Sequence, residues 1–198
     1  MAITLSILVY LYGSIQFSYL FTYVFSKKRL DSEGSRNIGV ANAFRIGGYG
    51  AGIFSVLGDV SKALLPIILS SLFYSADRRM SFIFLIIAVF GTRFPLFFII
   101  RGGKGRTVAG WGMLFIFPLA TFLLGVVWTA VLFLFRMDTF LSLIFTSLAV
   151  PLLLFAVYRD VFLMLLGIIL TVLVLLKSSR KNDDFIFYGV LRHKRSEE

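Results

Sequence analysis

The chain contains no cysteine, and its single histidine, His193, lies near the C-terminus. The lack of cysteine excludes disulfide bonds, thiolate metal sites and cysteine nucleophiles. With one histidine, a histidine-based metal cluster and a Ser-His-Asp triad are nearly excluded as well. We therefore expect no metal and no cofactor, so any catalysis has to rest on other groups.

Charged residues are also scarce, at 15% of the 198 residues, whereas 59% of the residues are hydrophobic. Soluble proteins have about 25% charged residues and about 45–50% apolar ones. A small globule cannot bury this much apolar surface, so lipid has to be the solvent for much of it. The composition predicts an all-α integral membrane protein, with residues 1–198 as one transmembrane domain and 176–198 as a basic cytoplasmic tail.

Long apolar runs divide the chain into candidate membrane spans. A spanning helix needs about 20 apolar residues. The candidates are Ile3–Phe25, Ile53–Tyr74, Ser81–Ile100, Thr107–Phe135, Phe140–Tyr158 and Val161–Leu176. The first run has neither a basic start nor a small-residue cleavage site, so we interpret it as a mature helix rather than a signal peptide. The polar stretches Lys27–Arg45 and Arg101–Arg106 are expected to be loops.

The number of crossings depends on Pro118, because proline removes a helix hydrogen bond and clashes with the preceding turn. A break there divides 107–135 into two segments, the first about 20 Å long and only partly spanning. The resulting seven crossings place the loops 27–45, 101–106, 136–138 and 177–195 on one side, with 15 of the 20 Lys and Arg residues. The positive-inside rule then predicts an external N-terminus and a cytoplasmic C-terminus. An unbroken helix would place the C-terminal cluster outside.

Two basic, glycine-bearing stretches are candidate anion sites. Gly34–Arg45 combines small residues, hydrogen-bonding side chains and two arginines, and Arg101–Arg106 places three glycines and three cations before a helix. Glycine lets backbone N–H groups approach an anion, and arginine can grip a phosphate with its planar fork. The second stretch lacks the spacing of a P-loop. Either stretch can also be an ordinary cytoplasmic loop whose charges set the topology.

Asp59 and Lys62 are charged residues within a predicted span. Their spacing of three puts them on one helix face, where they can pair. Charges inside a membrane are costly, which favours a functional role over a structural pair between helices. Arg93 lies in another predicted span without an acidic neighbour in sequence.

Five motifs, in order, resemble those of the acyl-phosphate-dependent glycerol-3-phosphate acyltransferase family of bacterial membranes, the PlsY family. Gly13–Tyr19 is similar to G-S-I-P-F-[GS]-Y, and Gly34–Arg45 to G-S-G-N-x-G-A-T-N-x-x-R. Leu57–Lys62 is similar to L-D-x-x-K-G with a slip at the aspartate, Gly91–Pro95 to G-H-x-F-P, and Arg101–Gly105 to K-G-G-K-G. The resemblance covers nearly the whole chain.

The resemblance implies seven helices in the bacterial inner membrane, with a cytoplasmic active site. The implied reaction transfers a fatty acyl group from acyl phosphate to the 1-hydroxyl of glycerol 3-phosphate. Its products are lysophosphatidic acid and phosphate, and it is the first step of phospholipid synthesis. An acyl phosphate is already activated, so the reaction needs no enzyme nucleophile. We expect these two substrates and membrane lipid as partners, no nucleic acid, and a monomer.

The resemblance also suggests the site residues. Ser35, Arg45 and Lys104 are the implied catalytic residues. The implied phosphate-binding residues are Asn37, Asn42, Gly102, Gly103, Ser142 and Asn182, with Asp59 and Lys62 as supporting intramembrane charges.

Departures from the family pattern keep other functions open. Thr92 and Ser179 stand where the family has histidines, Arg36 replaces a glycine, Ala41 a threonine, and Gln16 a proline. The alternatives are a non-catalytic or altered-substrate paralogue, or a small membrane transporter of phosphorylated anions. A transporter would favour inverted repeats with broken helices, and the sequence has no visible internal repeat.

Overall fold

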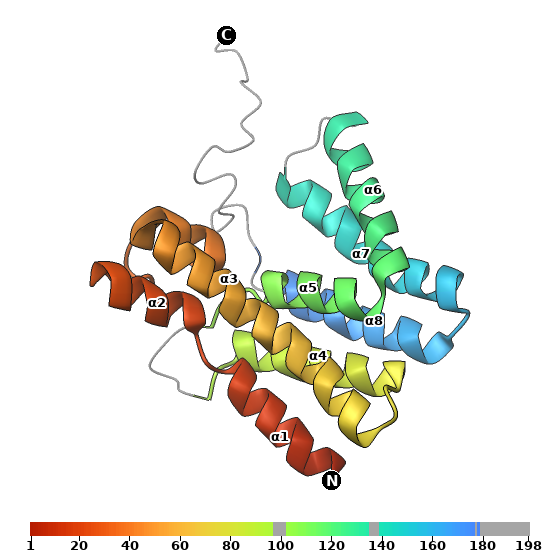
Figure 1. The fold of residues 1–198 in the computed structure, drawn as a ribbon. Coiled ribbons are helices and arrows are strands. Elements are labelled where there is room, and N and C mark those ends of the chain that lie inside the picture. Colours follow the sequence, from red (N-terminus) through yellow and green to blue (C-terminus); the bar gives the residue numbers. More distant parts are fainter. Residues whose placement is uncertain (97–101, 135–138, 177, 179–198) are drawn as a thin grey trace.

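The computed structural model describes residues 1–96, 102–134, 139–176 and 178, and within these residues the chain is helical, with no strand (Figure 1). This confirms the predicted all-α class. The helices are α1 (Ala2–Gly13), α2 (Phe17–Ser26), α3 (Val40–Phe73), α4 (Arg78–Arg93), α5 (Arg106–Ile116), α6 (Pro118–Leu134), α7 (Thr139–Tyr158) and α8 (Val161–Leu175).

The first predicted span is two helices rather than one. α1 ends at Gly13 and α2 begins at Phe17, because the backbone of Gln16 leaves the helical region, at φ −90° and ψ 77°. The carboxamide of the Gln16 side chain stabilises this break, since its Nε2 donates to the carbonyl oxygens of Ser14 and Thr92 at 3.3 and 3.0 Å. The continuous hydropathy of the segment gave no indication of the break.

The predicted loop Lys27–Arg45 is shorter than expected, because α3 already begins at Val40. Residues 40–45, predicted to be loop, form its first turns. α3 contains one non-helical residue, Gly48, at φ 80° and ψ −175°, a conformation that only glycine adopts readily. The two charged residues Asp59 and Lys62 lie beyond this kink and are buried within α3.

Prolines accompany two helix ends, and one of these ends lies inside the predicted span Ser81–Ile100. α4 stops at Arg93, two residues before Pro95, since the residue before a proline disfavours helical backbone. α5 ends at Ile116 and α6 begins at Pro118, so the predicted break at this proline is confirmed. Figure 1 shows α5 and α6 running in different directions from this point.

Glycines allow α1 and α4 to pack closely. A Cβ atom on Gly13 would lie 2.6 Å from the Ala88 carbonyl oxygen, and one on Gly91 would lie 2.5 Å from the Tyr10 carbonyl oxygen. Small residues at helix contacts are typical of membrane proteins, in which van der Waals packing drives helix association. Behind this contact, α4, α5 and α8 share a core that includes Phe82, Leu85 and Leu166.

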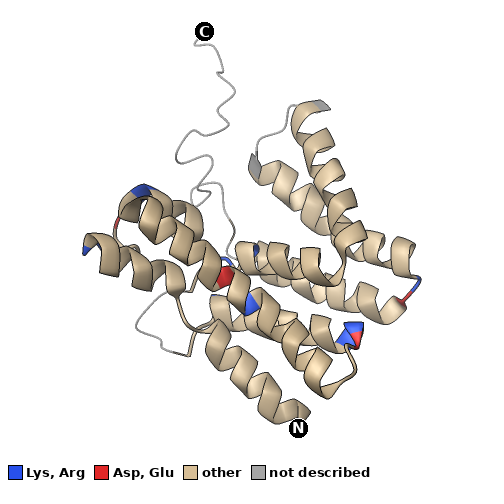
Figure 2. Ribbon diagram, viewed as in Figure 1, with Lys and Arg blue, Asp and Glu red and all other residues tan. Residues whose placement is uncertain are grey.

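The outer surface is suited to lipid. Within the part of the chain that the structure describes, three helical segments are long and apolar enough to span a membrane, namely Ala2–Ser26, Val40–Phe73 and Phe140–Tyr158. Many large apolar side chains are exposed, among them Leu72, Phe122, Phe133 and Leu152. Figure 2 shows that the charged residues of the described part lie mostly at helix ends and in loops, with further charges part-way along α3.

We predict that Gly91→Ala lowers the free energy of unfolding by about 1–3 kcal/mol, because its methyl group would overlap the backbone of α1. Gly110→Ala is the matched control, since nothing lies within 4 Å of a Cβ atom at that position of α5. Alanine should be neutral or stabilising there. Thermal melting of both purified variants in detergent measures the effect, and equal stability of the two would contradict the close α1–α4 contact.

Candidate functional site

A cavity of about 320 Å³ opens where five parts of the chain meet. Its wall is formed by the α1–α2 connection, the loop before α3, the middle of α3, the end of α4 and the loop before α5. The volume is at the lower end of the range for small-molecule sites. We call it the charged cavity; its charged and amide-bearing lining residues are Gln16, Asn37, Asp59, Lys62, Lys104 and Arg106.

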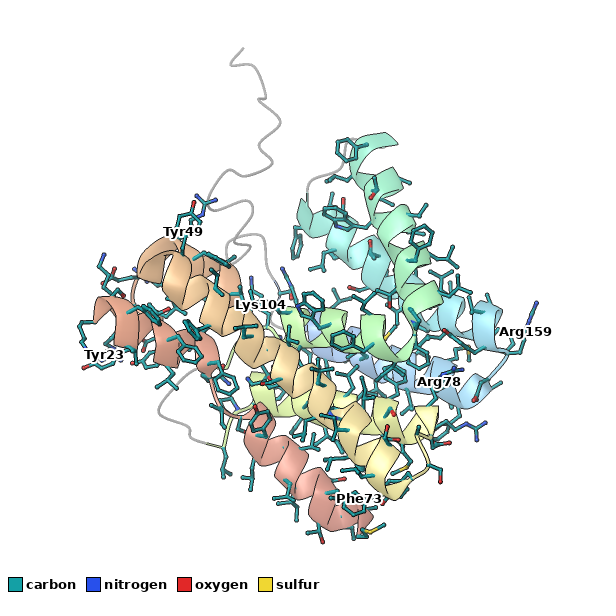
Figure 3. All side chains as sticks on the ribbon, viewed as in Figure 1. Tyr23, Tyr49, Phe73, Arg78, Lys104 and Arg159 are labelled. Carbon is teal, nitrogen blue, oxygen red and sulfur yellow. The ribbon has the colours of Figure 1, made fainter. Side chains whose placement is uncertain are left out.

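Lys104 enters the wall of the charged cavity from a tightly packed glycine loop. Its side chain is largely buried, and Figure 3 shows Lys104 near the middle of the molecule. A Cβ atom on Gly102 would overlap the Arg93 carbonyl oxygen, and one on Gly103 would overlap the Ile38 carbonyl oxygen. Gly105 has φ 70°, in the left-handed region, just before α5 begins. The glycines are therefore required to bring Lys104 to this position.

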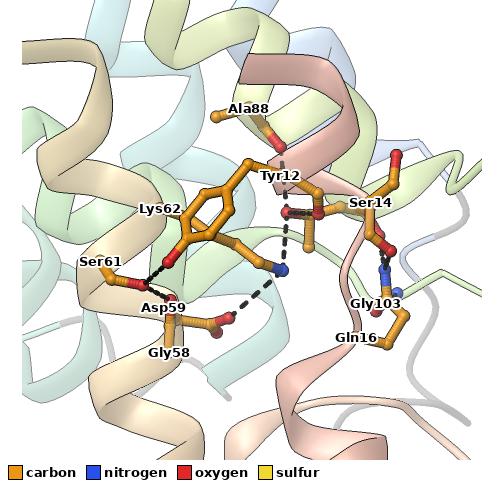
Figure 4. Close-up of polar contacts among 11 residues, drawn as sticks. Tyr12, Ser14, Gln16, Gly58, Asp59, Ser61, Lys62, Ala88 and Gly103 are labelled. Carbon is orange, nitrogen blue, oxygen red and sulfur yellow. Dashed lines mark hydrogen bonds and ion pairs between the residues drawn. The ribbon is translucent and has the colours of Figure 1, made fainter. Parts of the chain in front are cut away.

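The Gln16 side chain joins the glycine loop to the rest of the cavity wall. Its Oε1 accepts from the backbone N–H of Gly103 at 3.3 Å, while its Nε2 donates to the Thr92 carbonyl oxygen (Figure 4). One carboxamide thus connects the α1–α2 break, the end of α4 and the loop before α5. The family has proline at this position, which cannot form these side-chain hydrogen bonds.

Asp59 and Lys62 form the pair expected from their spacing. The Nζ of Lys62 lies 3.9 Å from Oδ1 of Asp59 and 3.4 Å from the hydroxyl of Thr92. It also lies 5.3 Å from the centre of the Phe17 ring, in reach of a cation–π contact. Lys62 is 1% exposed, so the pair is shielded from bulk solvent but adjoins the charged cavity.

Thr92 occupies the position of the first missing family histidine. Its hydroxyl lies 3.0 Å from the carbonyl oxygens of Gly13 and Ala88, and donates to them. A threonine hydroxyl has no basic nitrogen and does not ionise near neutral pH. The side chain therefore holds α1 against α4 and accepts from Lys62, but cannot serve as a general base.

Asn42 organises the loop before α3. It is fully buried, and its Nδ2 donates to the carbonyl oxygens of Leu30, Glu33 and Asn37 at 3.3, 3.2 and 3.0 Å. Its Oδ1 accepts from the backbone N–H of Ser35 at 3.3 Å. A residue expected from the resemblance to bind phosphate is thus placed beneath the loop, where it shapes the backbone instead of lining the charged cavity.

The structure brings only some of the sequence-predicted site residues into the wall of the charged cavity. Lys104, Gly103, Asn37, Asp59 and Lys62 line it. The others that the structure describes do not: Ser35 is buried with its Oγ accepting from the Asn37 N–H, Asn42 lies under the loop, Arg45 is exposed on α3, Gly102 packs on Arg93, and Ser142 is buried on α7. Asn182 lies outside the described residues.

Two residues of the cavity wall were not predicted to be site residues, namely Gln16 and Arg106. Gln16 was noted only as a departure from proline, and its role depends on partners 76 and 87 residues away in sequence. Arg106 belonged to the basic stretch, but its spacing relative to Lys104 did not reveal which of the cations face the cavity.

A second cavity, of about 290 Å³, lies between α5, α6, α7 and α8. We call it the apolar groove. Its lining includes Met113, Leu124, Leu143, Val150, Leu170 and Val174. Arg106 lines both the charged cavity and this groove, so a cation stands where the two meet. The pair of cavities fits a ligand with an anionic end and a hydrocarbon end.

The charges around the charged cavity favour an anion. Among the described residues that line it, Asp59 is the one acidic residue, against Lys62, Lys104 and Arg106. Charges of one sign in a cleft with low-dielectric walls concentrate ions of the opposite sign. Within the described parts of the chain, no group of three or more His, Asp or Glu residues could hold a metal ion.

The chain is similar to known proteins over most of its length. The family model for glycerol-3-phosphate acyltransferase matches residues 3–186. Relatives named glycerol-3-phosphate acyltransferase include one from Pseudomonas putida, 35% identical over 96% of this chain and 97% of its own length. Another, from Syntrophomonas wolfei, is 32% identical over 93% of each chain.

The fold is similar to that of crystal structures of PlsY (YgiH), described as an integral membrane glycerol 3-phosphate acyltransferase. Its glycerol 3-phosphate form matches with a TM-score of 0.74 and 26% identity, over 95% of this chain and 92% of that one. Its lysophosphatidic acid form matches with a TM-score of 0.73. The chain therefore belongs to the glycerol-3-phosphate acyltransferase family, and it is an integral membrane protein of the PlsY type.

Proposed function

We propose that the chain transfers a fatty acyl group from acyl phosphate to the 1-hydroxyl of glycerol 3-phosphate. The observation that carries this proposal is the meeting of the charged cavity and the apolar groove at Arg106. The charged cavity suits a small anion such as glycerol 3-phosphate, and the groove suits the hydrocarbon chain of the donor. Relatives over nearly the full length carry the matching name.

The proposed reaction is a direct transfer between the two bound substrates. The 1-hydroxyl oxygen attacks the acyl carbonyl carbon, a new ester C–O bond forms, and the bond from that carbon to the phosphate oxygen breaks. The hydroxyl proton passes to the departing phosphate, so the products are lysophosphatidic acid and inorganic phosphate. The chain has no cysteine, and the hydroxyl of Ser35 lies outside the cavity wall, which favours direct transfer over an acyl-enzyme.

Lys104 has the central role in this proposal. Its ammonium group would stabilise the negative charge that develops on the carbonyl oxygen and the departing phosphate. Asn37 would bind phosphate oxygens, and Gly102 and Gly103, whose close packing positions Lys104, would shape the phosphate site. Asp59 and Lys62 would add a fixed pair of charges at the inner end of the cavity.

The remaining predicted residues have supporting roles in the proposal. Asn42 and Ser35 would hold the loop that presents Asn37. Arg45, which is exposed on the first turns of α3, would attract anionic substrates before they bind. Ser142, whose Oγ has no hydrogen-bond partner among the described residues, and Asn182 remain proposed phosphate ligands.

We further propose a seven-crossing topology in the bacterial inner membrane, with the cavity facing the cytoplasm. Two contacts support this assignment of ends. Arg106 donates to Ser178 at 3.2 Å, which puts the start of α5 beside the end of α8. At the other end, Arg79 pairs with Asp160 at 2.8 Å, which joins the start of α4 to the α7–α8 turn. The end that holds Arg106 is the more basic of the two, as the positive-inside rule requires of the cytoplasmic side.

Because the chain has no cysteine, single cysteines can report this topology without background. We predict that Ser75→Cys, in the exposed α3–α4 turn, reacts with a membrane-impermeant maleimide on intact spheroplasts. Ser32→Cys, exposed in the loop before α3, should react only after the membrane is permeabilised. The reverse pattern would overturn the proposed orientation.

We predict that Lys104→Ala lowers the rate of acyl transfer at least about a hundredfold, the usual cost of removing one group that stabilises developing charge. Palmitoyl phosphate and glycerol 3-phosphate are incubated with purified protein, and lysophosphatidic acid and released phosphate are measured together. The control is Arg159→Gln, a loss of one cation in the exposed α7–α8 turn, at one end of the molecule in Figure 3. This control should keep full activity.

Two outcomes would contradict the proposal in different ways. Unchanged activity in Lys104→Ala would remove Lys104 from the chemistry. No activity in the folded wild-type protein would instead favour a paralogue with another acceptor or no catalysis, for which the replacement of the family histidine by Thr92 is the specific observation.

A further inference from the structure

We propose that Arg106 binds the phosphate of the acyl donor, and that the adjacent Arg93 positions and reinforces this donor site. The inference rests on the proposed function and assigns roles to two residues that the motifs quoted above do not specify. Arg93 occupies the unspecified position of G-H-x-F-P, and Arg106 follows K-G-G-K-G. The two arginines would separate the donor phosphate from the acceptor phosphate.

Arg106 stands where the two cavities meet, a place that suits an amphipathic anion. It lines the charged cavity together with Lys104, and it lines the apolar groove together with Ala109 and Met113. A glycerol phosphate has no hydrocarbon chain to place in the groove, whereas an acyl phosphate has one. The guanidinium therefore meets the donor's phosphate when the acyl chain occupies the groove, and its planar fork matches two phosphate oxygens.

Arg106 is held at this junction by its surroundings. It is the first residue of α5, and its Nη2 donates to the hydroxyl of Ser178 at 3.2 Å. The N-terminal N–H groups of α5 add positive charge on the same side. The donor phosphate would therefore meet a guanidinium, the Lys104 ammonium and a helix N-terminus together.

Arg93 lies behind the Lys104 backbone and is unusually buried for an arginine, at 4% exposure. Its Nη1 donates to the Lys104 carbonyl oxygen at 3.3 Å. Among the residues that the structure describes, its Nε and Nη2 have no hydrogen-bond partner, and no carboxylate forms an ion pair with it. Burying such a cation without an anion nearby is costly.

Arg93 contacts the backbone of Lys104, two residues before Arg106, so like charges gather here and repel each other. A phosphate bound at Arg106 would reduce this repulsion and would also balance the positive charge of Lys104. The family has a histidine where this chain has Thr92, and a protonated histidine could supply a positive charge there. The Thr92 hydroxyl cannot, and it is already bound to backbone carbonyls. The neighbouring Arg93 would supply that positive charge instead. This is a reason for a buried arginine at this end of α4.

Binding of hexadecyl phosphate tests the inference without turnover, because this phosphate monoester has a long chain but no acyl carbonyl. We predict that Arg106→Met raises its dissociation constant about tenfold or more, as expected when a charge-assisted hydrogen bond is lost. Arg93→Met should weaken binding less, and Arg93→Lys should restore most of it. Calorimetric titration of full-length protein in a non-ionic detergent measures each constant.

Two controls make the result specific to the donor site. Glycerol 3-phosphate is titrated into the same variants, and its dissociation constant should change less than about twofold, well under the tenfold effect predicted for the donor analogue. Arg159→Met removes an exposed cation at the α7–α8 turn and should leave both constants unchanged. Each variant is also melted, so that loss of folding is recognised.

The possible outcomes separate this inference from the proposed function. Unchanged hexadecyl phosphate binding in Arg106→Met, or an equal loss of glycerol 3-phosphate binding, would overturn the donor site. A lower melting temperature in Arg93→Met with unchanged hexadecyl phosphate affinity would make Arg93 a structural cation only. If the wild type binds hexadecyl phosphate but lacks acyl transfer, and Arg106→Met weakens this binding as predicted, the donor site is supported and the proposed reaction is not. In active protein, Arg106→Met should raise the KM for palmitoyl phosphate and leave that for glycerol 3-phosphate unchanged.

Discussion

The candidate site depends on one side chain, the carboxamide of Gln16. A helix broken inside a membrane leaves backbone N–H and C=O groups that water cannot satisfy, so the protein has to satisfy them. Gln16 does this for two other elements, accepting from the Gly103 N–H and donating to the Thr92 carbonyl. The break between α1 and α2, the end of α4 and the glycine loop are thereby held together, and the charged cavity lies between them.

The charges of the site follow from the same low-dielectric surroundings. Lys62 is buried but has Asp59 and the Phe17 ring beside it, so its charge is balanced within the protein. Lys104 and Arg106 also line the cavity, and no second carboxylate lines it within the described residues. A site with excess positive charge and no metal-binding cluster among these residues is suited to holding anionic substrates close together. For an activated acyl donor, proximity and charge stabilisation supply much of the catalysis.

Much of the fold was accessible from the sequence because lipid imposes a simple rule on composition. Apolar runs of about 20 residues predicted where helices lie, and Pro118 predicted the division between α5 and α6. The break at Ser14–Gln16 was missed because its residues interrupt the apolar run without any strong helix breaker. The early start of α3 was missed because Asn42 and Arg45 look like loop residues. Both lie within a helix, and the Asn42 side chain holds the preceding loop by hydrogen bonds.

The sequence by itself determined that this chain is helical, lies in a membrane, has most of its basic residues between apolar runs and carries the motifs of its family. These properties follow from composition and local order. Only the tertiary structure decided which motif residues line a common cavity. In the structure Asn42 lies beneath its loop, Gln16 lines the charged cavity, and Arg106 lies between the charged cavity and the apolar groove. Those placements depend on contacts between residues far apart in the chain, and local patterns carry no information about which helix faces which.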